Sequence, residues 1–167
     1  MARSKTQRGS ATHEATHKPW PLTERPGFLI RRLHQIHVAL FNETCGAFDL
    51  TPVQYSVLSA LAERGSADQT TLAADVFLDR TTTTGVLKRL ASRKLIERAV
   101  SDEDRRARDC RITPAGTVLL AKMESVARSA HLDTVAHLGK RDQKLLIAMM
   151  QRIVLNSSNN KTGTSDI

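Results

Sequence analysis

Apolar residues recur at helical spacing through most of the chain. Between residues 27 and 47, Leu29, Leu33, Ile36 and Leu40 form one stripe, and a stripe of this kind is typical of an amphipathic helix. The same periodicity returns several times further along the chain. It predicts further helices at residues 52–65, 69–76, 80–94, 114–138 and 141–155.

Helix-start residues stand where this periodicity begins. Thr51 can cap a helix, Pro52 suits the first helical position, and Gln54 sits where a capping box places it. Gly139 follows the long helix and is expected to end it. The other candidate caps are Asp68, Asp79 and Thr113, the last followed by Pro114.

The periodicity changes after the fourth helix. Residues 95–100 ("LIERAV") and 109–113 ("DCRIT") are short and strand-like, and the charged segment "SDEDRRAR" joins them. Three short helices followed by a two-stranded ribbon predict a winged helix-turn-helix. The expected fold class is therefore mainly α, with a two-stranded β wing and long N- and C-terminal helices that form a dimerisation region.

The two ends of the chain differ in composition from the helical part. The N-terminal segment is rich in Ser, Thr, His, Lys and Arg, and the last twelve residues ("NSSNNKTGTSDI") are polar. Both are expected to be disordered. The predicted organisation is a basic arm (1–24), one domain (25–155) with a DNA-binding lobe (50–113) between dimerisation helices (25–48 and 114–155), and a tail (156–167).

Composition narrows the function classes. The chain has 167 residues, which suits one domain. Its longest apolar run, 145–150, is too short to cross a bilayer, and we expect no secretion signal. Two cysteines, Cys45 and Cys110, fit a reducing cytoplasm. No phosphate-binding loop, metal-ligand spacing or nucleophile motif is present, so we expect no enzyme, no cofactor and no metal.

Charge is distributed unevenly. Residues 80–111 contain ten Lys or Arg and five acidic residues, a net charge of +5, whereas residues 26–79 carry −3. A basic segment of this kind favours a polyanionic partner if it coincides with a recognisable element. Otherwise it is an ordinary solvated face.

Four consecutive threonines, 81–84, begin the fourth predicted helix, although β-branched residues are mediocre helix formers. In a helix-turn-helix this N-terminal end enters the major groove. Short side chains, hydroxyls and methyls suit contacts with phosphates, base edges and thymine there. Lys88 and Arg89 follow at offsets that reach DNA. The alternative is a tolerated polar helix start, and we expect at least one threonine, Thr83 or Thr84, to pack inward.

The predicted hairpin tip carries Asp104, Arg105 and Arg106. An arginine on such a tip can enter the minor groove, whose negative potential attracts it, and Asp104 can orient it. The alternative is a solvated loop with a weak ion pair.

Residues 26–156 resemble the MarR family of bacterial transcriptional regulators. The resemblance rests on "LTPVQYSVLSAL", "TTLAADVFLDRTTTTGVLKRLASRKLIER" and "DEDRRARDCRITPAG". It implies a homodimer that binds double-stranded DNA with a pseudo-palindromic operator, with Arg106 in the minor groove. Lys94 stands where members of the family often have a glycine, so it must adopt a turn conformation that is less favourable for a residue with a side chain. The expected DNA-binding residues are Arg80, Thr81, Thr82, Thr83, Thr84, Lys88, Arg89, Arg105, Arg106 and Arg108.

Residues 24–41 ("ERPGFLIRRLHQIHVALF") are similar to the opening of a narrower group, the NicR and BpsR type of repressors of nicotinate and related aromatic-acid catabolism. This implies release from DNA by a small aromatic carboxylate, such as a hydroxynicotinate. Polar groups in the first apolar stripe supply candidates for its site, or else they are core residues bonded to protein groups. The candidates are His34, His37, Arg31, Arg32 and Tyr55.

The outer helices carry more apolar surface than a lone winged helix can cover. A second chain is expected to cover it, although the helices could instead fold back on their own chain. The residues concerned are Leu29, Leu33, Ile36, Leu145, Met149 and Ile153.

Two other functions stay open. One is a redox-sensing repressor that uses Cys45 or Cys110, although neither looks activated. The other is a basic protein that binds DNA without sequence preference.

Overall fold

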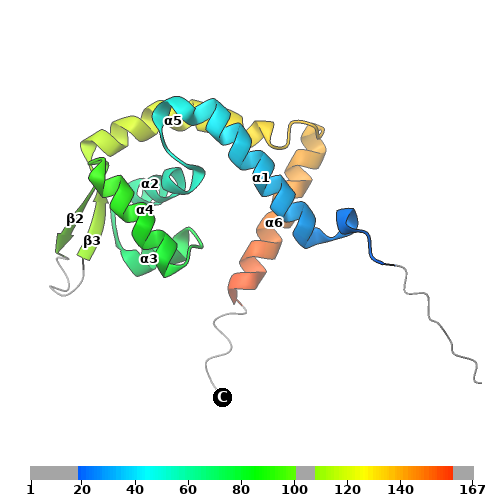
Figure 1. Cartoon of the computed structure of the whole chain (residues 1–167), viewed down its shortest axis with the longest axis horizontal. Helices are drawn as coiled ribbons and strands as arrows, with labels where there is room; N and C mark the ends of the chain where they lie inside the picture. The colour runs from blue at the N-terminus through cyan, green and yellow to red at the C-terminus, as the bar shows by residue number, and fades with distance from the viewer. Residues whose placement is uncertain (1–18, 101–107, 160–167) are drawn as a thin grey trace, which may run out of the picture.

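The computed structural model describes residues 19–100 and 108–159, and it leaves out the side chains of residues 99, 100, 108 and 157–159. The described chain is mainly helical with one small sheet (Figure 1). The predicted fold class, a winged helix-turn-helix with long terminal helices, is confirmed. In chain order the elements are η1 (Leu22–Glu24), α1 (Pro26–Cys45), η2 (Gly46–Phe48), α2 (Pro52–Arg64), β1 (Ser66–Asp68), α3 (Gln69–Asp75), α4 (Arg80–Ser92), β2 (Ile96–Val100), β3 (Arg108–Ile112), α5 (Pro114–Asp133) and α6 (Lys140–Asn159).

The helices start where the capping residues predict. At α2, the Thr51 hydroxyl accepts a hydrogen bond from the Gln54 amide at 3.2 Å, and the Gln54 side chain accepts one from the Thr51 amide at 3.0 Å. This reciprocal pair satisfies two amides that the helix leaves free. The remaining predicted caps also accept backbone amides, namely Asp68 at α3, Asp79 at α4 and Thr113 at α5.

Some helix ends differ from the periodicity. α5 ends at Asp133, five residues before the predicted end. Beyond it the backbone amides of Val135, Ala136 and Leu138 bond to carbonyls three residues back, a tighter turn that ends the α-helix. α4 ends at Ser92, and Lys94 adopts the left-handed region at φ 57°. The unfavourable turn conformation expected at Lys94 is therefore present.

The termini also depart from the predicted boundaries. α6 continues to Asn159, into the segment predicted as a tail. Of the predicted N-terminal arm, residues 1–18 lie outside the described chain, and η1 lies within the remainder.

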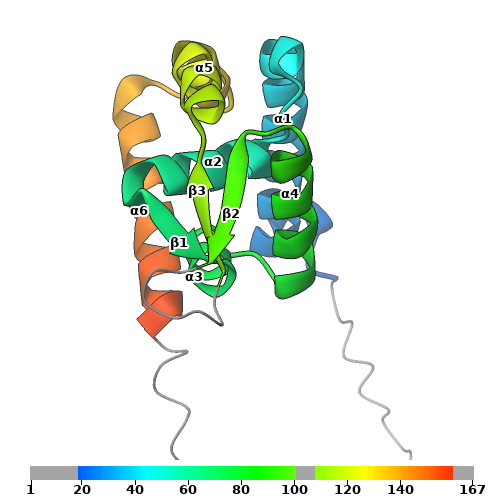
Figure 2. The ribbon, with the colours of Figure 1, turned by 90° about the vertical axis from the view of Figure 1, so that its left-hand side faces the viewer.

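A three-stranded antiparallel sheet lies beside α4, with the strands in the order β1-β3-β2 (Figure 2). The β2–β3 ribbon matches the predicted wing, with Ile96 opposite Ile112. The sequence did not indicate β1, which pairs Ala67 with Cys110. Its three residues are too few to have a detectable period.

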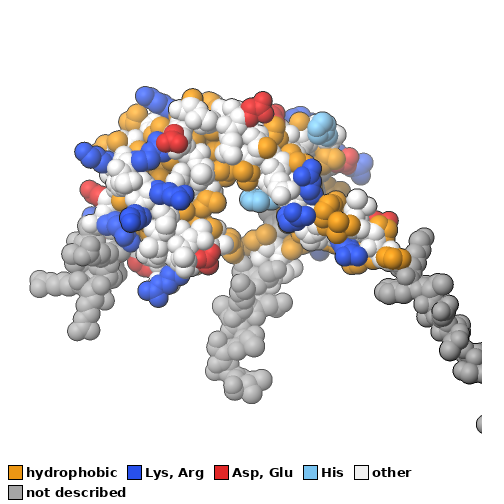
Figure 3. Space-filling model, in the orientation of Figure 1, with side chains coloured by type: hydrophobic (Ala, Val, Ile, Leu, Met, Phe, Trp, Pro, Cys, Tyr) orange, Lys and Arg blue, Asp and Glu red, His pale blue; other side chains and the backbone are white. Residues whose placement is uncertain are grey.

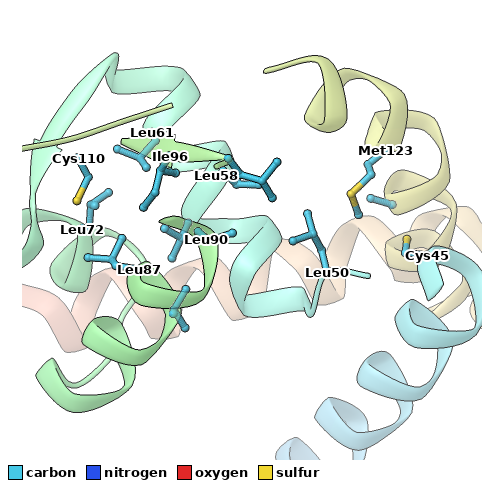
Figure 4. Packing of buried hydrophobic residues seen from close by; sticks show 14 of the residues in the cluster. Cys45, Leu50, Leu58, Leu61, Leu72, Leu87, Leu90, Ile96, Cys110 and Met123 are labelled. Atoms are coloured by element: carbon cyan, nitrogen blue, oxygen red, sulfur yellow. The ribbon is translucent and has the colours of Figure 1, made fainter. Parts of the chain in front are cut away.

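The core joins the predicted DNA-binding lobe to α1 and α5 (Figure 4). Leu58 and Leu61 of α2 are fully buried, as are Leu87 and Leu90 of α4. Further along, Phe41 and Cys45 of α1 meet Met123, Ala127 and Ala130 of α5. One continuous core therefore connects α4 to α1.

Apolar side chains remain exposed on α6 and on the first half of α1. Leu145 and Met149 of α6 are 50% and 48% exposed, and Leu29 and Ile36 of α1 are also exposed. Figure 1 shows α6 standing apart from the lobe. The alternative that these helices fold back on their own chain therefore holds for only one side of α1, which packs on α5. Within residues 19–100 and 108–159, no helix is long and apolar enough to span a bilayer.

Candidate nucleic-acid interface and effector site

The N-terminus of α4 is held by a single acidic residue. Asp79 accepts the Thr82 amide at 2.8 Å and the Thr82 hydroxyl at 2.6 Å. The two bonds to Thr82 hold the pKa of Asp79 below its usual value, because they favour the ionised carboxylate. The first turn of α4 is thus fixed in place while its outer side chains remain accessible.

The four threonines divide by exposure. Thr81, Thr82 and Thr84 are exposed, whereas Thr83 is fully buried and donates its hydroxyl to the Asp79 carbonyl at 2.8 Å. A buried side chain cannot touch DNA, so Thr83 leaves the predicted DNA-binding set. This is the inward packing expected for at least one of the four.

Basic side chains surround the threonines. Arg80, Lys88 and Arg89 are all exposed on α4. Figure 3 shows Lys and Arg side chains spread over the face of the lobe that carries α4. A helix N-terminus with free amides, hydroxyls and cations is suited to phosphate binding.

Arg89 also lines a depression of about 490 Å³ where α1, α2 and α4 meet. At its edge Arg93 donates to the backbone carbonyls of Phe48 and Asp49. The C-terminal end of α4 is therefore tied to the turn that follows α1.

One polar residue beside α4, Gln69, was not among the residues that the sequence indicated. The Gln69 side-chain amide, at the start of α3, donates to the Thr84 hydroxyl at 2.5 Å. Its oxygen accepts from the Arg98 guanidinium of β2 at 3.2 Å. The partners lie 15 and 29 residues away, so no local pattern could predict these contacts.

The predicted wing tip lies outside the described residues. Asp104, Arg105 and Arg106 fall within residues 101–107, and Arg108 begins β3 with a side chain that is not described. Their roles at the minor groove stay predictions.

Aromatic and imidazole rings gather where α1, α2 and α5 meet. His37 stacks on His131 with ring centroids 4.7 Å apart, and Tyr55 lies 5.7 Å from Phe41. His37 Nδ1 is 3.0 Å from the Thr134 hydroxyl, which in turn donates to the Ala130 carbonyl. The Tyr55 hydroxyl donates to a carboxylate oxygen of Glu124 at 3.2 Å. We call His37, Phe41, Tyr55 and His131 the ring cluster.

The ring cluster changes the acidity of its members. Burial lowers the pKa of His37, and the nearby His131 and His34 lower it further, since each effect opposes a positive charge. Burial raises the pKa of Tyr55, as does the adjacent Glu124 carboxylate. His37 is therefore neutral at pH 7.

Only part of the predicted ligand set joins this cluster. His37 and Tyr55 belong to it, whereas His34, Arg31 and Arg32 are exposed on α1. Arg32 donates to Gln35, and Arg31 lies over the Phe28 ring. Two residues at this cluster, His131 and Glu124, were not among the predicted site residues. Helical spacing from Met123 and Ala127 places His131 beside the inner face of α5, and this signal could have identified it.

Neither cysteine is accessible. Cys45 and Cys110 are both fully buried, and burial raises the pKa of each thiol. In the part of the chain that the structure describes, no group of three or more His, Cys, Asp or Glu side chains could hold a metal ion.

Comparison with known proteins places this geometry among DNA-binding regulators. A sequence model of the MarR family matches residues 50–107. Over 155 residues the chain is 28% identical to the HTH-type transcriptional repressor NicR of Pseudomonas putida, covering 93% of this chain and 97% of that protein.

Two solved structures are also similar. A probable transcriptional regulator from Pseudomonas aeruginosa is 32% identical, with a TM-score of 0.77 over 80% of this chain and 99% of that chain. BpsR of Bordetella bronchiseptica, whose DNA binding is regulated by 6-hydroxynicotinic acid, is 29% identical. Its TM-score is 0.77 over 81% of this chain and 97% of that chain.

Proposed function

The chain belongs to the MarR family of transcriptional regulators, and from this premise we propose that it is a repressor released from DNA by a small aromatic carboxylate. As a homodimer it binds a pseudo-palindromic operator. The observation that carries the effector part is the ring cluster, which lies between the dimerisation helices and the DNA-binding lobe.

DNA binding rests on α4 and the wing. The exposed Arg80, Thr81 and Thr82 enter the major groove at the N-terminal end of α4, while Lys88 neutralises phosphate further along. Arg106 contacts the minor groove beside it. Since α4 and the wing extend from one lobe, each lobe engages one half-site.

Dimerisation rests on α1 and α6. The exposed Leu145 and Met149 of α6 and Leu29 of α1 form apolar surface that a second copy covers. A two-fold dimer places its two recognition helices about one DNA turn apart, roughly 34–36 Å. An operator with two-fold symmetry matches this arrangement.

The ring cluster supplies the chemistry for an aromatic acid. The half-buried Tyr55 and the exposed His131 offer faces for an aromatic ring, while His37 and the Tyr55 hydroxyl offer hydrogen bonds. A bound carboxylate also favours protonation of His37, which burial keeps neutral in its absence. NicR and BpsR, the latter regulated by 6-hydroxynicotinic acid, support this ligand class.

Release follows from where the cluster lies. An effector that separates His37 of α1 from His131 of α5 changes how the lobe is held against the dimerisation helices. If it binds better to a dimer whose half-site spacing does not fit the operator, it shifts the population toward that state. Affinity then falls because the two half-sites are no longer engaged together.

The test measures release of a defined duplex. A duplex selected by the protein from a random pool is titrated by fluorescence anisotropy, with and without millimolar 6-hydroxynicotinate. We expect the acid to weaken binding about tenfold. The uncharged 6-hydroxynicotinamide should have little effect, because it cannot form the charge-assisted bonds of a carboxylate.

Matched variants locate the effector. His37→Leu should abolish the response to the acid, whereas His137→Leu, in the turn between α5 and α6, should keep it. If no response is seen, or if His37→Leu responds like the parent, the effector assignment is wrong. If the parent holds a scrambled duplex as tightly as the selected one at raised salt, sequence-indifferent binding is correct instead.

A further inference from the structure

Gln69 connects the wing strand to the recognition helix through one side-chain amide. It is the first residue of α3, and it contacts α4 through Thr84 and Arg80 and β2 through Arg98. We infer that Gln69 is a positioning residue that fixes β2 against α4, so that the wing and the recognition helix meet DNA with a set spacing. This inference rests on the DNA-binding role proposed above.

The three partners allow only one orientation of the amide. An arginine guanidinium can only donate hydrogen bonds, so Arg98 must face the Gln69 oxygen. The Arg80 carbonyl can only accept, so it must face the Gln69 nitrogen, from which it lies 3.4 Å. A flipped amide would place donor against donor and acceptor against acceptor. The nitrogen of the amide therefore contacts α4 and its oxygen contacts β2.

Thr84 has no free hydrogen-bond donor in this arrangement. Its hydroxyl accepts from Gln69 at 2.5 Å and donates to the Arg80 carbonyl at 2.8 Å. The hydroxyl hydrogen is thus already used within the protein. Thr84 therefore offers DNA its methyl group and one remaining acceptor lone pair, while its donated hydrogen and its bond from Gln69 hold α4 against Gln69.

The residue before Gln69 anchors it firmly. Asp68 ends β1 and caps α3, accepting the amides of Thr70 and Thr71 at 2.6 and 3.1 Å. β1 also pairs with β3, the central strand of the wing sheet. Gln69 thus stands on backbone that is fixed from both sides, which lets its amide position the more exposed Arg98.

Loss of the Gln69 bonds should affect specific binding more than non-specific binding. The phosphate-contacting cations stay in place, so attraction to any duplex persists. What is lost is the fixed spacing between α4 and the wing, and this spacing strengthens binding only at a DNA site whose grooves match it. The hydrogen bonds concerned correspond to about a tenfold change in affinity.

The experiment compares isosteric variants on two duplexes. Gln69→Met keeps side-chain length but removes the amide, and Thr84→Val replaces the hydroxyl with a methyl. Both variants and their double are titrated against the duplex that the parent selects from a random pool and against a scrambled duplex. Thr117→Val is the matched control, because its hydroxyl also donates to a carbonyl four residues back, but in α5.

We expect Gln69→Met and Thr84→Val each to weaken binding to the selected duplex about tenfold, with the double no weaker than either single variant. Affinity for the scrambled duplex and the thermal midpoint should match those of Thr117→Val. Parental affinity of Gln69→Met for the selected duplex, additive losses in the double variant, or equal losses on both duplexes would each overturn the inference. A parent that binds no duplex would instead refute the proposed function.

Discussion

His37 of α1 and His131 of α5 stack with their ring planes 21° apart and their centroids 4.7 Å apart. Two imidazoles at this distance cannot both carry a positive charge without repulsion. The contact that joins the first helix to the long helix therefore opposes a positive charge on His37, whose pKa burial and the neighbouring imidazoles lower.

This pair makes stability depend on pH. The pKa of His37 is lowered in the folded protein, so the unfolded chain binds a proton first as the pH falls. The stability it contributes is present above the ordinary histidine pKa of about 6.5 and is lost as the pH falls through the lower folded pKa. We expect the urea midpoint to fall between pH 7.5 and 5, above the range where carboxylates titrate. In His37→Gln the fall should be smaller, and an equal fall in both proteins would contradict this role.

Dimer formation should depend on Met149. A carboxylate at this exposed apolar position of α6 would be buried unpaired at the proposed interface, which costs about 3 kcal/mol, or roughly a hundredfold in the dimer dissociation constant. Analytical ultracentrifugation of Met149→Asp should find monomer at concentrations where the parent is dimeric. Lys144→Asp, on the other side of α6 by helical spacing, should remain dimeric. If Met149→Asp also stays dimeric, α6 is not the interface.

Gly116 should tolerate no side chain. An added Cβ would lie 2.2 Å from the Leu95 carbonyl oxygen and 2.8 Å from Ile112 Cγ1, and the backbone oxygen cannot move away cheaply. We expect Gly116→Ala to lower the free energy of unfolding by about 2 kcal/mol, measured by urea denaturation. Gly85→Ala is the control, because its Cβ meets nothing within 4 Å, and it should raise stability by about 0.5–1 kcal/mol. Equal effects would mean that the close approach at Leu95 is not restrictive.

The buried cysteines should not sense oxidants. Burial keeps Cys45 and Cys110 in the thiol form, whereas the thiolate is the reactive species. Reaction with a disulfide reagent at pH 7.5 should be about tenfold or more slower in the native protein than in urea. Peroxide should not release DNA from the parent or from Cys45→Ser. Release from the parent that Cys45→Ser abolishes would favour a redox-sensing repressor.

Short-range signals predicted much of the fold. Thr51 and Gln54 lie three residues apart, and their capping box forms where expected. The same holds for the caps Asp68 and Asp79, because capping chemistry acts within one turn. The predicted end of α5 was wrong because the amides of Val135 and Ala136 bond three residues back, a tightening of the chain that apolar periodicity does not encode.

Long-range contacts account for what sequence patterns missed. Thr134 approaches His37, 97 residues away, and Gln69 meets Arg98 across 29 residues. His37 was recognisable as a polar group in an apolar stripe and His131 by its helical spacing from Met123 and Ala127, but the stacking of the two rings depends on how α5 crosses α1. Arg31 and Arg32 have the right chemistry for an acid, but helical geometry places them on the solvent side of α1.

α5 has a mechanical consequence for the whole lobe. It is one uninterrupted helix of 20 residues, about 30 Å long. Near its start Gly116 is pressed against the wing base at Leu95, and near its end His131 stacks on His37. About 22 Å separates the two points, so a tilt of about 5° at one moves the other by about 2 Å. A stiff helix of this kind transmits a small separation of the two imidazoles to the wing. The resulting displacement at the base of the wing is comparable to the length of a hydrogen bond.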